Sequence, residues 1–232
     1  MRNLAFLLFF VSHFSFSQYE GPRTAAQVGT VYREVPISGT QYVNEMYQKG
    51  EAIMNGKTTG EILMRYDAYH EVVEFLENGK PRKLLRGKNI TAIIDGVRYE
   101  VVEFNEKGKS KLGYLSPLNE GETVLYYRPK KQFIQAENPE NGYDDYQPAT
   151  FKDISTYYIK SGDTPATEVR LSKSSILKKL SDQKPVLKKY ILEHDLDFKS
   201  MEDVTKLLAY YNTIKKTSGS IHNSEMGTTV GK

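Results

Sequence analysis

Short hydrophobic runs separated by turn residues, about every eight to twelve positions, dominate the chain from residue 49 onward and restrict the folds open to it. This spacing is typical of antiparallel β structure, in which consecutive strands are joined by tight turns. The expected strands are residues 51–54, 61–66, 71–76, 82–85, 90–94, 97–104, 111–115, 123–127 and 132–136. The separating dipeptides are Asn55-Gly56, Asn78-Gly79, Asp95-Gly96 and Glu120-Gly121.

Asp95-Gly96 predicts a definite strand register. A two-residue type I′ turn needs positive φ at both central positions, which Asp-Gly and Asn-Gly tolerate best. A turn there pairs Ile94 with Val97 and Ala92 with Tyr99, and it puts all four side chains on one face. This alternation indicates a sheet with one buried face.

Asn78-Gly79 predicts a second hairpin of the same kind. Its register pairs Glu77 with Lys80, which have opposite charges, and Val73 with Leu84.

The stretch RYDAYHEVVEFLENGK, residues 65–80, contains Asp67, His70 and Glu71 close together. A carboxylate that orients a histidine is the arrangement of a general base. The sequence nominates no companion nucleophile, and Asp is favoured at turns. We therefore predict a turn at residues 67–70, with Met64 opposite Val73, and leave a catalytic role as the less favoured alternative.

The pattern changes towards the C-terminus. Residues 137–148 form a loop rich in Pro, Asn, Gly and Asp, and strands are expected at 150–160 and 167–171. A helical period then predicts helices at 174–180, at 184–193 and from Ser200, where Asp203 completes a capping box. The apolar stripe of the last helix, Val204, Leu207, Leu208 and Tyr211, is expected to pack on the sheet or on the preceding helix.

Residues 1–17 resemble a secretory signal peptide. Arg2 precedes the apolar residues 4–11, and small residues precede a cleavage site before Gln18. The apolar run is too short to cross a bilayer as a helix, which takes roughly 20 residues, and no later segment is expected to span one. The alternative is a buried N-terminal helix. We expect an exported protein, periplasmic or extracellular.

Composition excludes several classes of site. The chain has no cysteine, so it has no disulfide, thiolate metal site, cysteine nucleophile or lipidated N-terminal cysteine. With 32 Lys and Arg against 29 Asp and Glu, the charge is near balance and gives no argument for nucleic acid. The C-terminal helices contain two lysine pairs, Lys178-Lys179 and Lys188-Lys189. We expect them to lie on a solvated helix face, and a basic strip that binds anionic polymers or lipids is the alternative.

Two polar clusters are candidates for metal binding, although we predict no metal and no cofactor. His194, Asp195 and Asp197 lie between two helices, where such residues usually cap helix ends. The acidic residues of the 137–148 loop lack the spacing of a calcium loop. They are Glu137, Glu140, Asp144 and Asp145, and Asn141 lies among them as a further oxygen ligand.

Tyrosine is abundant, with 17 residues and no tryptophan. Strand doublets such as Tyr126-Tyr127 and Tyr157-Tyr158 place one ring on each face. Packing within the sheet explains most of them, but exposed tyrosines suit binding surfaces. The candidate binding surface comprises Tyr127, Tyr143, Tyr146 and Tyr158.

Two segments, LMRYDAYHEVVEFLENGK and VLKKYILEHDLDFKSMEDVTKLLAYYNTI, are similar to a group of uncharacterised secreted proteins of the Bacteroidetes. The similarity extends over most of the chain, from about residue 39 to residue 216. It implies export and carries over no functional residue, because no activity is attached to the group.

The sequence predicts a mainly β, α+β fold, with an antiparallel β-meander that forms an open barrel or curled sheet. The expected divisions are signal peptide 1–17, N-terminal arm 18–40, β domain 41–171, helices 172–216 packed on it, and disordered tail 217–232. The favoured function is non-enzymatic binding of an unknown envelope component, protein or small apolar ligand. A barrel-like carrier lined by Ile62, Met64, Val73 and Phe75 and an envelope-directed hydrolase remain alternatives.

Overall fold

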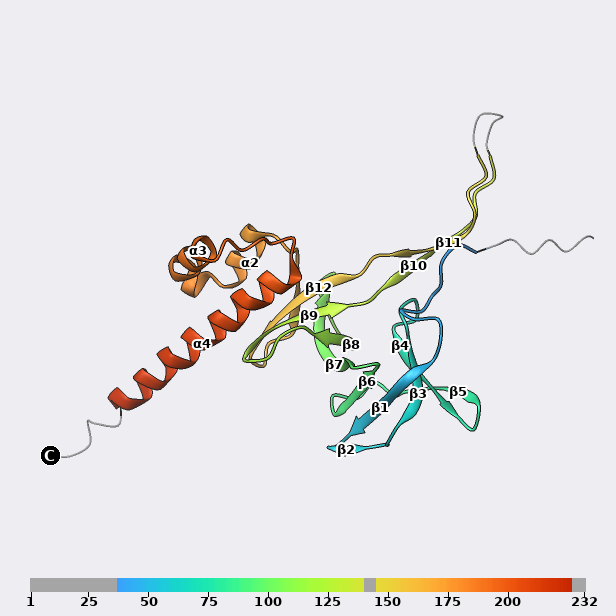
Figure 1. Cartoon of the computed structure of the whole chain (residues 1–232), viewed down its shortest axis with the longest axis horizontal. Helices are drawn as coiled ribbons and strands as arrows, with labels where there is room; N and C mark the ends of the chain where they lie inside the picture. Colours follow the sequence, from blue (N-terminus) through green and yellow to red (C-terminus); the bar gives the residue numbers. More distant parts are fainter. Residues whose placement is uncertain (1–36, 140–144, 227–232) are drawn as a thin grey trace, which may run out of the picture. The chain divides into compact units, whose positions relative to one another are not determined.

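Strands are the more abundant regular structure in the described part of the chain, residues 37–139 and 145–226 of a computed structural model, with side chains placed up to residue 216 (Figure 1). The protein is mainly β, with a curled sheet and a small C-terminal helical unit, as predicted. The predicted signal peptide, residues 1–17, and most of the predicted N-terminal arm, residues 18–40, lie outside the described residues.

The strands and helices have the following bounds. The strands are β1 Gln48–Met54, β2 Lys57–Thr58, β3 Ile62–Asp67, β4 Val72–Glu77, β5 Lys80–Lys83, β6 Ile90–Ile94, β7 Val97–Glu106, β8 Lys109–Pro117, β9 Thr123–Arg128, β10 Lys131–Ile134, β11 Thr150–Asp153, β12 Thr156–Ser161 and β13 Ala166–Val169. The helices are α2 Lys173–Lys179, η1 Ser181–Gln183, α3 Lys184–Glu193 and α4 Met201–Met226.

The main sheet runs in the order β13-β12-β9-β8-β7-β6-β1-β3-β4-β5, with β2 paired to β1. Neighbouring strands along this order are antiparallel, as expected for hairpin connections. Strands β10 and β11 form a separate two-stranded sheet, here called the arm.

A parallel pairing between β13 and β7 closes five strands, β7, β8, β9, β12 and β13, into a small barrel. The closure uses only the end of β7, where Phe104 lies opposite Ala166, whereas the beginning of β7 pairs with β6. Phe104, Leu115 and Tyr158 are buried inside this ring and fill it with side chains.

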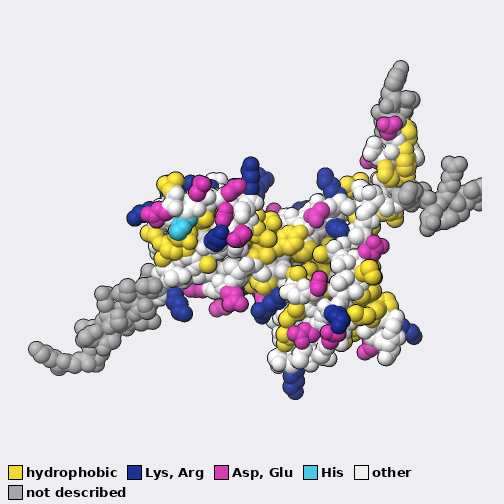
Figure 2. All heavy atoms as spheres, in the orientation of Figure 1, with side chains coloured by type: hydrophobic (Ala, Val, Ile, Leu, Met, Phe, Trp, Pro, Cys, Tyr) yellow, Lys and Arg dark blue, Asp and Glu magenta, His cyan; other side chains and the backbone are white. Residues whose placement is uncertain are grey.

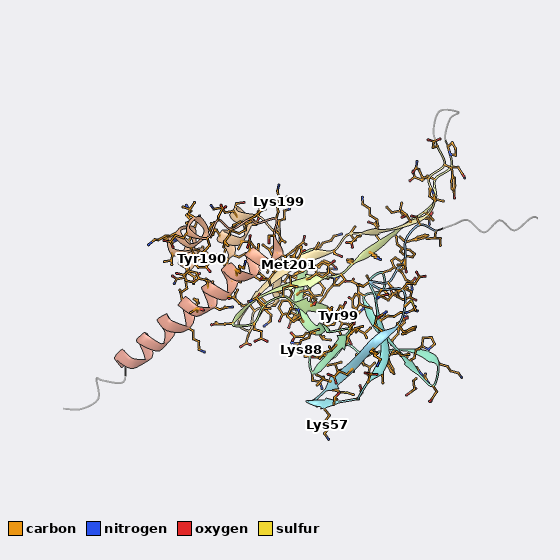
Figure 3. The ribbon with its side chains drawn as sticks, in the orientation of Figure 1. Lys57, Lys88, Tyr99, Tyr190, Lys199 and Met201 are labelled. Carbon is orange, nitrogen blue, oxygen red and sulfur yellow. The ribbon has the colours of Figure 1, made fainter. Side chains whose placement is uncertain are left out.

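The other half of the sheet curls over a second hydrophobic cluster. The Tyr66 hydroxyl of β3 donates to the Tyr114 carbonyl of β8 at 3.5 Å, and the Tyr114 hydroxyl donates to the Leu85 carbonyl at 2.6 Å. Tyr66 also stacks on Tyr99, labelled in Figure 3, with ring centroids 4.8 Å apart. Burial raises the pKa of Tyr114 to about 12. These contacts bring β3 over β8 and so curl the sheet.

The helical unit packs on the outer face of the barrel. Leu125 of β9 and Val169 of β13 share one buried cluster with Leu187 and Leu207 of the helices, which confirms that the apolar helix stripe faces the sheet. The Asn212 side chain of α4 also accepts from the Thr123 backbone N–H at 2.9 Å. None of the helices in the described ranges combines the length and hydrophobicity that a membrane crossing requires.

Both glycine turns have the predicted register. Ile94 lies opposite Val97 and Ala92 opposite Tyr99. Glu77 lies opposite Lys80, and the Leu84 N–H donates to the Val73 carbonyl at 2.9 Å. Asn78 and Asp95 have the positive φ that the turn type demands.

The β3–β4 register is two residues away from the prediction. Met64 lies opposite Phe75 rather than Val73, and Asp67 pairs with Val72 instead of belonging to the turn. The turn comprises residues 68–71, because Asp67 ends β3 and its carboxylate accepts hydrogen bonds from the turn backbone. A shift of two residues keeps every side chain on its predicted face.

Three further predictions differ from the structure. The expected strand 150–160 is broken between Asp153 and Thr156, because β11 pairs with β10 while β12 pairs with β9. Helix α4 continues to Met226, although disorder was expected from residue 217. Asp203 accepts from the Asp197 N–H rather than returning a bond to Ser200, whose hydroxyl does accept from the Asp203 N–H.

Gly50 permits β1 to lie between β3 and β6. A Cβ at this position would lie 2.4 Å from the Ile93 carbonyl oxygen. We expect Gly50→Ala to lower the free energy of unfolding by about 1–3 kcal/mol in urea denaturation, because two strands would have to move apart. The exposed change Met54→Ala in the same strand should stay within about 0.5 kcal/mol of wild type, and equal losses would contradict this account.

Candidate functional site

The turn between β3 and β4 gathers the titratable side chains that the sequence singled out. Asp67, only 1% exposed, accepts the backbone N–H groups of Tyr69 and His70 through Oδ1, at 3.0 and 2.9 Å. Its Oδ2 accepts from the Gln41 side chain at 3.1 Å. The buried carboxylate therefore has hydrogen bonds at both oxygens, as a buried charge requires.

His70 completes a dyad with Asp67. Its Nδ1 lies 2.7 Å from Asp67 Oδ2, and its side chain is 50% exposed. The geometry resembles that of a carboxylate that orients a general base. Among the described residues, the imidazole has no hydroxyl or other nucleophile as a hydrogen-bond partner. Within the described residues, the dyad thus has a base and the carboxylate that orients it, but no nucleophile bonded to the base.

Glu71 ends the turn with a φ of 56°, in the left-handed region that non-glycine residues seldom adopt. The Arg86 guanidinium donates to the carbonyls of His70 and Glu71, at 3.1 and 2.8 Å. Arg128 of β9 donates to both carboxylate oxygens of Glu71, at 2.6 and 3.0 Å. Two arginines therefore hold the unfavourable backbone conformation in place.

Arg128 is the centre of a buried network, with 3% of its surface exposed. Besides Glu71, it donates to Glu106 of β7 at 2.7 Å and to the Tyr158 hydroxyl of β12 at 3.0 Å. Its guanidinium lies over the Phe104 ring, 4.4 Å from the centroid. These hydrogen bonds and the ring contact compensate the cost of burying the guanidinium charge.

Electrostatics at this network favour the charged forms. The hydrogen bond from Lys111 lowers the pKa of Glu106, and those from Arg128 and Lys130 add to the effect against the opposing burial. Burial acts to lower the pKa of Arg128, but its hydrogen bonds to Glu71 and Glu106 outweigh it and raise that pKa. Arg128 and Glu106 therefore remain charged and form ion pairs, and neither is suited to exchange a proton as an acid or base.

The other candidate residues have capping roles or lie outside the described chain. His194 ends α3, with its N–H donating to the Tyr190 carbonyl at 3.1 Å. Asp197 accepts from the Lys199 N–H at 2.9 Å, a turn-stabilising bond. Residues 140–144 of the acidic loop lie outside the described residues. No cluster of three potential metal ligands occurs within residues 37–139 and 145–226.

The three candidate tyrosines within the described residues do not form one surface. Tyr158 is 1% exposed and lies inside the barrel, so the prediction that it belongs to a binding surface is wrong. Tyr127 is half-buried against Tyr157, with ring centroids 5.4 Å apart, and Tyr146 is exposed. Tyr143 lies outside the described residues.

Arg128 is the site residue that sequence reasoning missed. The sequence did contain a signal for it. Val124, Tyr126 and Arg128 occupy alternate positions of β9, so all three side chains lie on one face, and the first two face the barrel interior. The expected strand ended at residue 127, one position too early to include the arginine on the inward face.

We expect Arg128→Gln to lower the free energy of unfolding by about 3–5 kcal/mol, because two carboxylates would lose their buried partner. Urea denaturation followed by circular dichroism measures this loss. Arg82→Gln is the matched control, since the Arg82–Glu77 pair is exposed and should be worth at most about 1 kcal/mol. Similar losses in the two variants would contradict the assigned role.

The lowered pKa of Glu106 predicts acid sensitivity. A carboxylate whose pKa is lower in the folded state stabilises the fold fully above its unfolded pKa, about 4.3, and loses this contribution as the pH falls towards the folded value. The free energy of unfolding of wild type should therefore decrease on acidification below about pH 5. Glu106→Gln should show a shallower decrease in a pH series, and parallel curves would argue against the prediction.

No protein family model, curated protein or solved structure matches this chain. No residue role or ligand is therefore transferred from a relative, and the similarity to secreted Bacteroidetes proteins stays an expectation from the sequence.

Proposed function

We propose that the protein is an exported, non-enzymatic binding or envelope-associated protein. The observation that carries this proposal is a cluster of partly exposed rings next to the β3–β4 turn, here called the aromatic surface: Tyr69, His70, Phe133 and Phe151. Export rests on the signal-peptide pattern of residues 1–17.

The aromatic surface connects the turn with the base of the arm. The Tyr69 ring meets His70 edge-on at 4.7 Å and Phe151 edge-on at 5.5 Å, and Phe133 lies 5.1 Å from Phe151. Tyr69 and His70 are exposed, and the two phenylalanines are half-buried. Figure 2 shows further hydrophobic side chains on the described residues of the hairpin that contains β10 and β11. Contiguous exposed rings favour binding of a partner.

The backbone beneath this surface is fixed. Asp67 binds the N–H groups of Tyr69 and His70, and the Lys131 N–H of β10 donates to the Ala68 carbonyl at 2.9 Å. A rigid surface loses little conformational entropy when it binds, so more of the contact energy appears as affinity. The dense polar bonding of the turn supports binding, because it positions exposed rings.

Catalysis has weaker support. An acyl-transfer or glycosidic site needs a nucleophile or a second carboxylate that can reach the substrate. Asp67 is fully hydrogen-bonded, and Glu71 is held by Arg128. We therefore keep a hydrolase only as the least favoured alternative.

A carrier of a small apolar molecule also has little support. Met64 and Val73, two of the residues proposed to line its cavity, are completely buried, and Ile62 and Phe75 pack against the same cluster. Side chains that fill a core leave no volume for a ligand.

Photocrosslinking at position 69 tests the binding function. We expect p-benzoylphenylalanine in place of Tyr69, introduced in the producing cell, to give on irradiation one adduct of defined mass, because the ring would contact the bound partner. Native mass spectrometry of the same preparation should show a chain that begins at Gln18.

Leu192 is the matched control position, since it is 76% exposed on α3 and belongs to no ring cluster. The same probe at position 192 should give no such adduct. Equal adducts at both positions, or none at position 69, would count against the aromatic surface. A chain that retains Met1 would count against export, and a stoichiometric apolar ligand released only on unfolding would favour the carrier.

A further inference from the structure

A groove of about 630 Å³ lies between β13 and α2. Its size is within the range of small-molecule sites, about 300–1,000 Å³. The residues that line it are Glu168, Val169, Arg170, Ser175, Lys178 and Lys179. None of them belongs to the aromatic surface, so the groove calls for a separate explanation.

Packing fixes the two walls of the groove. Val169 of β13 and Ile176 and Leu177 of α2 are buried in one hydrophobic cluster, which holds the helix against the barrel. Ser172 between them caps α2, accepting the Ser175 N–H at 3.3 Å. The charged neighbours of these buried residues are consequently held at the groove on both sides.

The groove has an excess of positive charge. Arg170, Lys178 and Lys179 face a single carboxylate, Glu168. Lys179 is placed by a hydrogen bond from its Nζ to the Thr167 hydroxyl at 2.7 Å. The formal charge of the lining is three positive groups minus one negative group, a net of two positive charges.

These cations are not paired within the described part of the chain, where no carboxylate lies within salt-bridge distance of any of the three. On the neighbouring helices, Lys189, Lys206 and Lys215 each have a carboxylate partner within 4 Å, whereas Lys184 and Lys188 have none among the described residues. Like charges gathered around a hollow raise the local concentration of anions.

We propose that this groove binds a small phosphomonoester of a polyol, such as a sugar phosphate. A phosphate dianion matches the two net positive charges, and Arg170 can donate two parallel hydrogen bonds to its oxygens. The Ser175 hydroxyl is a further donor, and Glu168 can accept hydrogen bonds from ligand hydroxyl groups. The carboxylate thereby distinguishes a sugar phosphate from phosphate alone.

Isothermal titration calorimetry of the full chain with glucose 6-phosphate tests the assignment. We expect saturable binding at one site, weaker binding of inorganic phosphate and none of glucose. Arg170→Gln and Lys178→Gln should each weaken the binding of glucose 6-phosphate about tenfold or more, which corresponds to losing one charge-assisted contact. Glu168→Gln should reduce the preference for glucose 6-phosphate over inorganic phosphate.

Lys188→Gln is the control, because Lys188 is an exposed lysine of α3 outside the groove. It should leave binding unchanged. All variants alter exposed side chains, and circular dichroism checks that they fold. Absence of saturable binding at millimolar ligand, or equal weakening by Lys188→Gln, would overturn the site. Equal affinity for inorganic phosphate and glucose 6-phosphate would overturn the polyol assignment. Neither result bears on the aromatic surface.

Discussion

The buried guanidinium of Arg128 is the interaction on which the arrangement of the strands depends. It binds Glu71, which is 57 positions away, together with Glu106 of β7 and Tyr158 of β12. A buried ion pair adds little net stability over a hydrophobic substitute, but it is costly to leave half-formed. Its main effect here is therefore geometric, since it attaches the β3–β4 turn to the end of the barrel in one position.

The position of that turn decides what the surface presents. With Glu71 held by Arg128 and the turn N–H groups held by Asp67, the chain must project Tyr69 and His70 outward. The Tyr69 ring meets Phe151 because β11 pairs with β10, whose Lys131 N–H donates to the Ala68 carbonyl of the turn. The same polar groups that suggest catalysis in the sequence are thus the supports of an aromatic surface.

Local signals predicted the parts of the fold that local chemistry determines. The Asn-Gly and Asp-Gly turns were assigned to the correct register because positive φ at two adjacent positions admits few alternatives. Asp67 misled the prediction because an aspartate can stand in a turn or accept bonds from it, and burial decides between the two. The closure of β13 on β7 and the burial of Tyr158 depend on contacts between segments distant in sequence, for which alternation gives no signal.

The aromatic surface and the groove between β13 and α2 differ in whether their charged groups are ion-paired, and the two proposed kinds of ligand follow from this difference. Beside the β3–β4 turn, Arg128 and Lys130 are neutralised by Glu71 and Glu106, so the adjacent aromatic surface has its rings next to compensated charges. In the groove beside α2, Arg170, Lys178 and Lys179 share one carboxylate, Glu168, and none of them is ion-paired within the described chain. Removing water from these cations is costly unless an anion takes its place. A chain with nearly balanced total charge can therefore have both a surface of rings and a groove with excess positive charge, because the total charge does not fix the local charge.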